Sequence, residues 1–234
     1  IVAAIGVPED HSVDNRRMVA ALPIAIRLHG GEIKEDSPVE SIDMTSDSIA
    51  VTLDTGEKIS ADRLVLAAGP WSRQIAGLPD EWVPPVRPVK GQILELKMES
   101  PFSLSHVVRG SRAYLVPRSD GRLIVGATSE EMGFDDRLTA GGVFSVLEGG
   151  SLLVPGILEQ ELLAAEVGFR PGSRDHQPII GFTGDPRLFI ATGHYRHGIL
   201  LSAITALEAA DSILDKKESE LMSFFSPKRF LSTT

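Results

Sequence analysis

The 234-residue sequence predicts an α/β (α+β) chain in which an α/β layer is interrupted by an antiparallel sheet. Three observations lead to this expectation. Apolar residues recur at helical spacing after residue 14, a continuous apolar run at 64–68 is typical of a buried strand, and short strand-like segments separated by turns fill residues 91–129. The chain then closes with a strand, a polar turn and a helix, the order in which α/β layers are built.

The first element expected is a helix that Asp14 caps. Apolar residues from Met18 to Ile26 follow the helical period, and Gly30 and Gly31 provide a stop. Pro23 lies inside this pattern, so a kink or an interruption is expected there.

Strands are expected next, in residues 32–43 and 48–69, with Asp54-Thr55-Gly56 as the hairpin turn between alternating segments. The run 64–68 has no polar residue, which is the pattern of a strand buried on both faces.

Four prolines between Pro79 and Pro88 then mark a crossing into a second unit. Antiparallel strands are expected at 91–99, 105–110, 113–118 and 122–129, with a turn at Ser119-Asp120-Gly121. A helix at 140–159 is weakened by Gly149, Gly150 and Pro155. A strand at 164–173, a strand at 187–193 and a helix that starts near Gly198 complete the chain.

The composition excludes several functional classes. A formal net charge of -9 leaves no basic patch for a phosphate backbone, so no nucleic-acid partner is expected. The absence of cysteine excludes disulfides, a thiolate metal site and a flavin attached through sulfur, and no metal site is expected. No apolar run approaches the roughly 20 residues that span a bilayer, and no signal peptide opens the chain, so we expect no membrane partner and a cytoplasmic location.

The end of the chain carries the most chemical information. A buried strand ends at Gly193, a polar turn follows, and the N-H groups at the start of the next helix favour a negative charge. A strand, a glycine and a helix also occur in many α/β proteins without any such role, so both interpretations stay open on these residues alone.

Four segments in order resemble the glycine oxidase and D-amino-acid oxidase family of FAD-dependent oxidoreductases. They are VDNRRMVAAL, ADRLVLAAGPWS, YLVPRSDGRLIVGATSEEMGFD with GFRPGSRDHQPIIG, and LFIATGHYRHGILLSAITALEAADSIL. The joint occurrence of PVKGQ, RPGSRD and GHYRHGILL is most similar to the glycine oxidases of thiamine biosynthesis. The resemblance implies an incomplete Rossmann-like FAD-binding layer at 1–83 and 188–234, and an antiparallel-sheet substrate domain at 84–187.

The activity that the resemblance implies is oxidation of a small amino acid or secondary amine, such as glycine, sarcosine or a D-amino acid, to its imine. Hydride would pass to FAD, and dioxygen would then yield hydrogen peroxide. A homo-oligomer is compatible with this family. The alternatives are a catalytically silent fragment or subunit, and another flavin dehydrogenase of the same superfamily.

The substrate residues that the resemblance implies are Arg170, Tyr114 and Arg196. The planar guanidinium of Arg170 suits two contacts to a carboxylate, Tyr114 would supply a hydroxyl to the same group, and Arg196 would lie on the substrate side. An arginine that merely ends a strand and a tyrosine of an amphipathic strand are the alternatives. No side chain is required as a catalytic acid or base, because the flavin carries the redox step.

The resemblance also implies a set of cofactor contacts, with Val39 meeting the adenine end. Small residues let a backbone approach a ligand closely, but they also simply end strands. Two histidines in a turn without acidic partners are a poor metal site and are also ordinary turn residues. The set is Val39, Ala68, Gly69, Trp71, Gly193, His194, His197, Gly198, Ile199 and Leu200.

Other polar residues receive weaker expectations. Lys90 of PVKGQ is either near the flavin or a solvated strand-end lysine, and the acidic residues at 130–136 are expected to form a solvated loop. The chain begins at Ile1 and contains no GxGxxG after an opening strand, so we expect a fragment or processed product that by itself binds FAD weakly or not at all.

Overall fold

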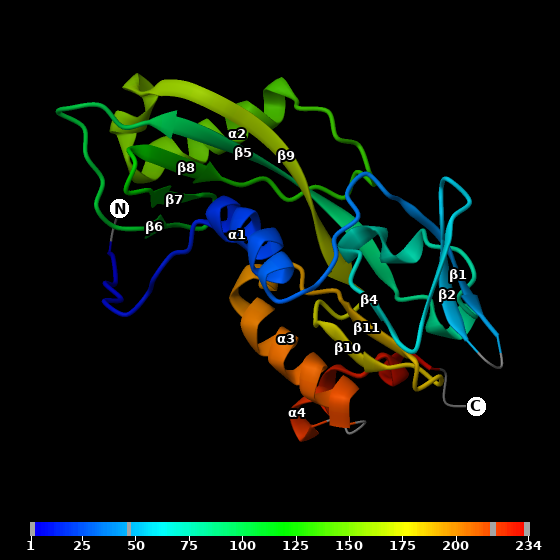
Figure 1. Cartoon of the computed structure of the whole chain (residues 1–234). Helices are drawn as coiled ribbons and strands as arrows, with labels where there is room; N and C mark the ends of the chain where they lie inside the picture. Colours follow the sequence, from blue (N-terminus) through cyan, green and yellow to red (C-terminus); the bar gives the residue numbers. More distant parts are fainter. Residues whose placement is uncertain (1–2, 46–47, 216–218, 232–234) are drawn as a thin grey trace. The chain divides into compact units, whose positions relative to one another are not determined.

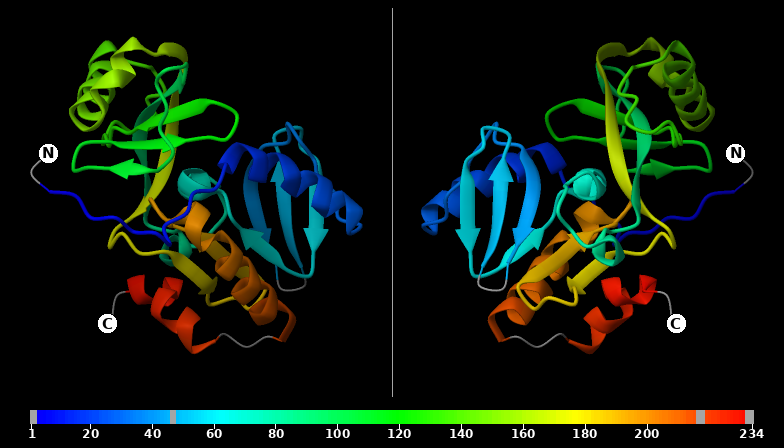
Figure 2. Two further views of the ribbon diagram at one scale, coloured as in Figure 1. Left: turned by 90° about the vertical axis from the view of Figure 1, so that its left-hand side faces the viewer. Right: turned by 90° about the vertical axis from the view of Figure 1, so that its right-hand side faces the viewer.

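The computed structural model describes residues 3–45, 48–215 and 219–231, and it divides into two compact units (Figures 1 and 2). Unit 1 comprises Ile1–Ile33 and Lys90–Phe169, and unit 2 comprises Lys34–Val89 and Arg170–Thr234. The chain passes from one unit to the other three times: after Ile33, inside strand β5 (Val86–Lys97) and inside strand β9 (Glu161–Ser173). These two units are defined by the packing of the chain. The expected division into a FAD-binding layer at 1–83 and 188–234 and a substrate domain at 84–187 stays a prediction.

Unit 1 contains a five-stranded sheet with the order β6-β7-β8-β5-β9. Adjacent strands from β6 to β5 are antiparallel, which confirms the expected antiparallel sheet. The turn between β7 and β8 lies at the predicted Ser119-Asp120-Gly121, where Gly121 has φ of 88°. The strands are β5 (Val86–Lys97), β6 (Val108–Arg109), β7 (Tyr114–Pro117), β8 (Arg122–Gly126) and β9 (Glu161–Ser173).

Helix α2 (Ala140–Leu153) packs beside this sheet and is followed by the 3-10 turn η3 (Pro155–Glu159). A Cβ on Gly150 would lie 2.7 Å from Ile157 and 2.8 Å from Val125, so the glycine lets helix and sheet approach closely. The predicted helix therefore runs through its glycines and ends before Pro155. The buried core of this unit is formed by Leu94, Leu96, Leu115, Leu123, Val125, Val146 and Ile157.

Helix α1 (Asn15–Leu28) starts where the sequence predicts, because an oxygen of the Asp14 carboxylate accepts a hydrogen bond from the Arg17 N-H at 3.2 Å. The helix runs through Pro23 without ending, so the alternative of an interruption is wrong. Proline removes only one backbone donor, and the remaining helical hydrogen bonds keep the segment together. The helix stops before Gly30, whose φ is 80°.

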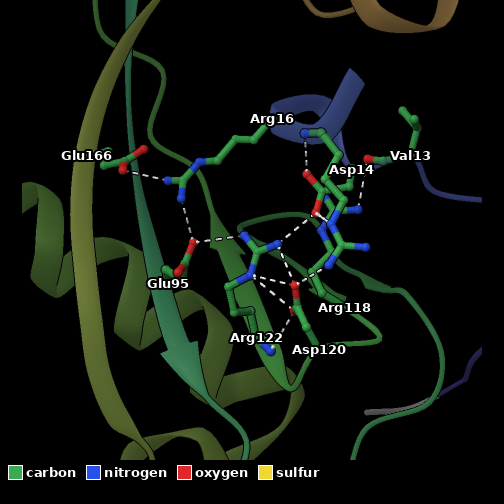
Figure 3. A network of polar contacts seen from close by, with 9 residues as sticks. Val13, Asp14, Arg16, Glu95, Arg118, Asp120, Arg122 and Glu166 are labelled. Atoms are coloured by element: carbon green, nitrogen blue, oxygen red, sulfur yellow. Dashed lines mark hydrogen bonds and ion pairs between the residues drawn. The ribbon is translucent and has the colours of Figure 1, made fainter. Parts of the chain in front are cut away.

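None of the residues of α1 is buried, and ion pairs join its start to the sheet of unit 1 (Figure 3). Arg16 bridges two strands, with contacts of 3.0 Å to Glu95 of β5 and 2.5 Å to Glu166 of β9. Arg122 of β8 contacts both the Asp14 cap at 2.7 Å and Glu95 at 3.4 Å. The buried Glu95 carboxylate is thus shared by two arginines, and α1 is held by charge instead of apolar burial.

Unit 2 contains two three-stranded sheets. In the first, β1 (Val39–Met44), β2 (Ile49–Leu53) and β3 (Lys58–Ala61) are antiparallel neighbours (Figure 2). The β2–β3 turn uses the predicted Asp54-Thr55-Gly56, and Gly56 has φ of 82°.

The second sheet has the order β10-β11-β4 and lies beside helix α3 (Figure 1). β11 pairs antiparallel with β10 and parallel with β4. Helix α3 packs on β10 and β11, and α4 packs on β10. The elements are β4 (Leu64–Leu66), β10 (Ile179–Phe182), β11 (Leu188–Thr192), α3 (Gly198–Asp215) and α4 (Glu220–Phe225), with 3-10 turns η1 (Gly69–Arg73), η2 (Asp80–Trp82) and η4 (Pro227–Phe230).

Strand β4 corrects one expectation from the sequence. Val65 is 44% exposed, so this strand is not buried on both faces within unit 2. Leu66, on the other face, belongs to a core that includes Ile42, Ile49, Ile179, Leu188 and Ile190. The last residues of the predicted C-terminal helix, beyond 215, fall outside the described residues. Within the described ranges, none of the helices combines the length and the apolar character that crossing a bilayer requires.

The charge network makes a prediction about acid stability. Hydrogen bonds from Arg122 hold the pKa of Asp120 at about 2, below its ordinary value of 3.8. A carboxylate whose pKa is lower in the folded state stabilises the fold above the unfolded pKa, and this stabilisation is lost as the pH falls through the folded value. The difference in unfolding free energy between wild type and Asp120→Asn should therefore be constant above about pH 5 and shrink between about pH 4 and pH 2.

Urea unfolding across this pH range measures that difference. Glu159→Gln is the matched control, because Glu159 is an exposed carboxylate of the same unit with no side-chain hydrogen bond among the described residues. If the difference in unfolding free energy between wild type and Asp120→Asn did not change with pH, the stabilisation of the Asp120 carboxylate by Arg122 would be contradicted.

Candidate functional site

The parallel pairing of β4 and β11 brings two predicted segments to one edge of the sheet. Ala68 and Gly69 follow the carboxyl end of β4, and Gly193 and His194 follow the carboxyl end of β11. Because the strands are parallel, both carboxyl ends lie at the same edge, where α/β sheets bind ligands.

Buried hydroxyl groups fix the two strand ends to one another. The Thr192 hydroxyl donates to the Gly69 carbonyl oxygen at 2.9 Å, and the Ser72 hydroxyl donates to Thr192 Oγ1 at 3.3 Å. Both side chains are almost fully buried, so these hydrogen bonds are shielded from water. The segment after β4 and the end of β11 therefore form one connected backbone edge.

Glycine is required at this edge by backbone conformation. Gly69 has φ of 54° and Gly193 has φ of 76°, in the left-handed region that side chains disfavour. A Cβ on Gly69 would have no heavy atom within 4 Å, so there is open space beside this backbone. Trp71, in η1, is 48% exposed. The edge thus presents open backbone at Gly69 beside a half-exposed aromatic side chain.

The turn after β11 leads directly into α3. The His197 N-H donates to the His194 carbonyl oxygen at 2.9 Å, which closes the turn, and α3 begins at Gly198 as expected. Ile199 and Leu200 of its first turn are exposed. The start of an 18-residue helix carries unpaired N-H groups and a partial positive charge, which favour an anionic group near this turn.

The side chain of His194 has a structural partner. Its Nε2 lies 3.0 Å from Thr205 Oγ1 of α3, and the imidazole is half-buried. Burial lowers the pKa of His194 below the ordinary value of 6.5, so the neutral form predominates at neutral pH. This residue can present a polar but uncharged surface at the site.

Two predicted arginines lie on backbone segments that touch. The Tyr195 N-H donates to the Pro171 carbonyl oxygen at 3.0 Å, and Gly172 forms a β-bridge with His194. Arg170 directly precedes Pro171, and Arg196 directly follows Tyr195, so each arginine is adjacent in sequence to one partner of this hydrogen bond. Arg170 is half-buried in β9, whereas Arg196 is exposed, with its guanidinium 5.3 Å from the centre of the Tyr195 ring. The fold therefore places two cations near the end of β11.

Val39 and Tyr114 lie elsewhere. Val39 begins β1, whose Ile42 N-H donates to the Ala76 carbonyl oxygen at 2.9 Å, shortly after η1. Tyr114 belongs to unit 1, on β7, opposite Gly126 of β8. A Cβ on Gly126 would lie 2.4 Å from the Tyr114 ring, so the ring packs directly on that glycine.

Lys90 is fully buried, which excludes the solvated lysine that the sequence left open. Its Nζ donates to the Arg137 carbonyl oxygen at 2.6 Å and lies 3.5 Å from the Asp135 carboxylate. Hydrogen bonds from the Arg137 side chain, with a smaller contribution from Lys90, hold the pKa of Asp135 well below its usual range. This part of the acidic segment is structural.

Gln92 anchors both ends of the same loop to β5. Its Nε2 donates to Glu130 at 2.8 Å, and its Oε1 accepts the Thr139 N-H at 2.9 Å. The expectation of a solvated acidic loop is therefore wrong for Glu130 and Asp135. The available signal was the spacing of Lys90 and Gln92, which lie two positions apart and so on one face of β5, because polar groups buried on one face need partners.

The packing of Tyr114 on Gly126 is testable without any ligand. Gly126→Ala should displace the ring and destabilise the fold by roughly 1–3 kcal/mol, the usual cost of overpacking. Gly168→Ala is the control, because Gly168 is a strand glycine of the same unit whose Cβ would meet nothing within 4 Å. Urea unfolding of both variants measures the effect, and equal stabilities would show that Tyr114 does not depend on this glycine.

Comparison with known proteins identifies the family of this chain. The family model described as FAD dependent oxidoreductase matches residues 1–212. The bifunctional protein ThiO/ThiG of Synechocystis sp. is 41% identical over 97% of this chain, which spans 34% of that protein's length. The glycine oxidase of Geobacillus kaustophilus is 37% identical over 94% of the chain, which spans 58% of its length.

Solved structures show the same likeness. The crystal structure of glycine oxidase from Geobacillus kaustophilus has a TM-score of 0.82 and 35% identity, covering 92% of this chain and 58% of that one. Iminodiacetate oxidase from Chelativorans sp. has a TM-score of 0.79 and 28% identity, covering 90% of this chain and 58% of its own. The resemblance inferred from the four segments is confirmed: this chain belongs to the family of FAD-dependent oxidoreductases.

Proposed function

We propose that this chain forms the substrate-binding part and the flavin-facing edge of an enzyme that oxidises a small amino acid or secondary amine to its imine. The observation that supports this most is the convergence at one sheet edge. Open glycine backbone at Gly69, the start of α3, and the segments that carry Arg170 and Arg196 all meet near the end of β11. The glycine oxidases among the relatives make an amine the natural substrate class.

FAD fits the residues at this edge. At Gly69, where a Cβ would meet no heavy atom within 4 Å, the backbone could approach a flat ring, with Ala68, Trp71, Gly193 and His194 beside it. The N-terminus of α3, from His197 to Leu200, would stabilise negative charge on that ring, and Val39 would meet the adenine end. When bound, FAD supplies a two-electron acceptor.

The substrate carboxylate would be held by Arg170. Its guanidinium offers two parallel N-H donors to a carboxylate, and Arg196 adds a second positive charge from the neighbouring segment. We further propose that the Tyr114 hydroxyl contacts the same carboxylate, a role that rests on the resemblance to the family. A neutral His194 adds no third cation, so the site is suited to a single small anion.

The protein contributes orientation, and the overall reaction balances without an acid or base side chain. Loss of the hydrogen on the α carbon with its electron pair, and of one N-H proton, converts the amine to the imine. Dioxygen takes up two electrons and two protons and becomes hydrogen peroxide. Holding the carboxylate fixes which carbon faces the acceptor, and this positioning is the main contribution expected from the arginines.

A chimera tests the proposed reaction. Because the chain spans 58% of the glycine oxidase of Geobacillus kaustophilus, the part of that enzyme outside the matched region can be joined to it. The purified chimera should carry oxidised flavin, visible as a yellow spectrum, and produce peroxide with glycine or sarcosine. A flavin that is reduced only by a hydroxy acid or a polyol would contradict amine oxidation.

The role of Arg170 is tested in the same chimera. A charged contact to a carboxylate contributes roughly 1.5–3 kcal/mol, so Arg170→Ala should raise the KM for glycine by a factor on the order of tens or more. Arg170→Lys should recover only part of this loss, because a point charge cannot reproduce the paired geometry. The flavin spectrum should change little.

Methylamine, which lacks a carboxylate, provides the discriminating comparison. Arg170→Ala should affect glycine far more than methylamine, whereas Arg174→Ala, an exposed arginine four positions later, should affect neither. An equal loss with both amines would show that Arg170 supports the fold and does not bind the carboxylate.

A further inference from the structure

A cavity lies at the opposite ends of the strands that form the candidate site. Its volume is about 570 Å³, and it lies within unit 2. Arg63 directly precedes β4, and Arg187 directly precedes β11, so the parallel pairing brings both to the amino ends of these strands. The Leu64 N-H donates to the Arg187 carbonyl oxygen at 2.8 Å and joins the starts of the two strands. Five strand residues, roughly 15 Å, separate this cavity from Gly193.

Cations from three separate segments line the cavity. They are Arg63, Arg187 and Lys228, with Asp62 as an acidic neighbour. Within residues 3–45, 48–215 and 219–231, the side chains of Arg63 and Lys228 make no hydrogen bond or ion pair. Like charges that converge without partners repel one another, and an anion between them would remove this cost.

Arg187 is positioned by its own loop. The side-chain Nε of Arg187 donates to an Asp185 carboxylate oxygen at 2.9 Å, and the backbone N-H of Arg187 donates to the same oxygen at 2.8 Å. The Thr183 hydroxyl accepts the Asp185 N-H at 3.1 Å, so the turn between β10 and β11 is bonded internally. The wall of the cavity is therefore preorganised, which reduces the entropic cost of binding.

The cavity also has an apolar side. Phe182 and Pro186 line it, and the Phe182 ring is held edge-on against the buried Phe189, with ring centres 5.1 Å apart. The three cations of the lining outnumber the carboxylates of Asp62 and of Asp185, which pairs with Arg187, so the cavity favours an anion, and the apolar wall matches an organic group attached to it. A phosphate monoester combines both properties, with three acceptor oxygens and a charge near -2 at neutral pH.

We propose that this cavity binds a small phosphate monoester, with Arg63 and Lys228 contacting the phosphate and Phe182 contacting the organic group. The site is separate from the proposed oxidation site and does not depend on it. Arg63 offers a planar fork to phosphate oxygens, whereas Lys228 offers a flexible point charge.

Isothermal titration calorimetry of the 234-residue chain at low ionic strength tests this proposal with phenyl phosphate, inorganic phosphate and benzoate. Phenyl phosphate should bind most tightly, inorganic phosphate more weakly because it lacks the ring, and benzoate most weakly because it carries one charge. Arg63→Ala and Lys228→Gln should each weaken phenyl phosphate by about five-fold or more. Arg73→Ala, which removes an exposed arginine of the same unit outside the cavity, should leave the affinity unchanged.

Three results would overturn the proposal: no saturable binding of phenyl phosphate at millimolar concentration, benzoate binding as tightly as phenyl phosphate, or an equal loss of affinity in Arg73→Ala. Circular dichroism of each variant verifies folding. Because Lys228 is exposed, Lys228→Gln keeps the test decisive even if Arg63→Ala fails to fold.

Discussion

The parallel pairing of β4 with β11 is the constraint on which both proposed sites of unit 2 depend. These strands come from residues more than a hundred positions apart, and their register, with Leu64 opposite Leu188, aligns both ends at once. Thr192 completes the pairing by donating its buried hydroxyl to the Gly69 carbonyl oxygen. The carboxyl ends then present glycine backbone and a helix start, whereas the amino ends present arginines. One pair of strands thus creates two edges of different chemistry.

In unit 1, polar contacts attach helix α1 and the loop after β8 to the sheet. Helix α1 buries none of its residues, and the carboxylates of Asp14 and Glu95 attach it through Arg16 and Arg122 (Figure 3). The loop after β8 is fastened to β5 through Gln92 and the buried Lys90. Such contacts stabilise a fold only when every buried partner is satisfied, and they specify one arrangement of the segments they join.

Charge is distributed unevenly along this acidic chain. The net charge of -9 argues against polyanion binding by the whole surface, yet arginines gather at both ends of the β4–β11 pair. Arg170 and Arg196 adjoin the turn after β11, and Arg63 and Arg187 precede the strands. A few cations in a preorganised setting suit small anions, and the surrounding negative charge disfavours large ones. Local placement of charge therefore matters more for function than its sum.

The sequence by itself determined the helix capped by Asp14, the hairpin at Asp54-Thr55-Gly56 and the antiparallel strands of unit 1, because each depends on local periodicity and turn chemistry. The segments around Gly69 and Gly193 were likewise recognisable as family motifs. Only the tertiary structure decided that Lys90 is buried, that Val65 is exposed and that Arg63 lies near Lys228. These properties depend on pairing between distant residues, and the burial of a side chain is set by what packs against it, which no local pattern contains.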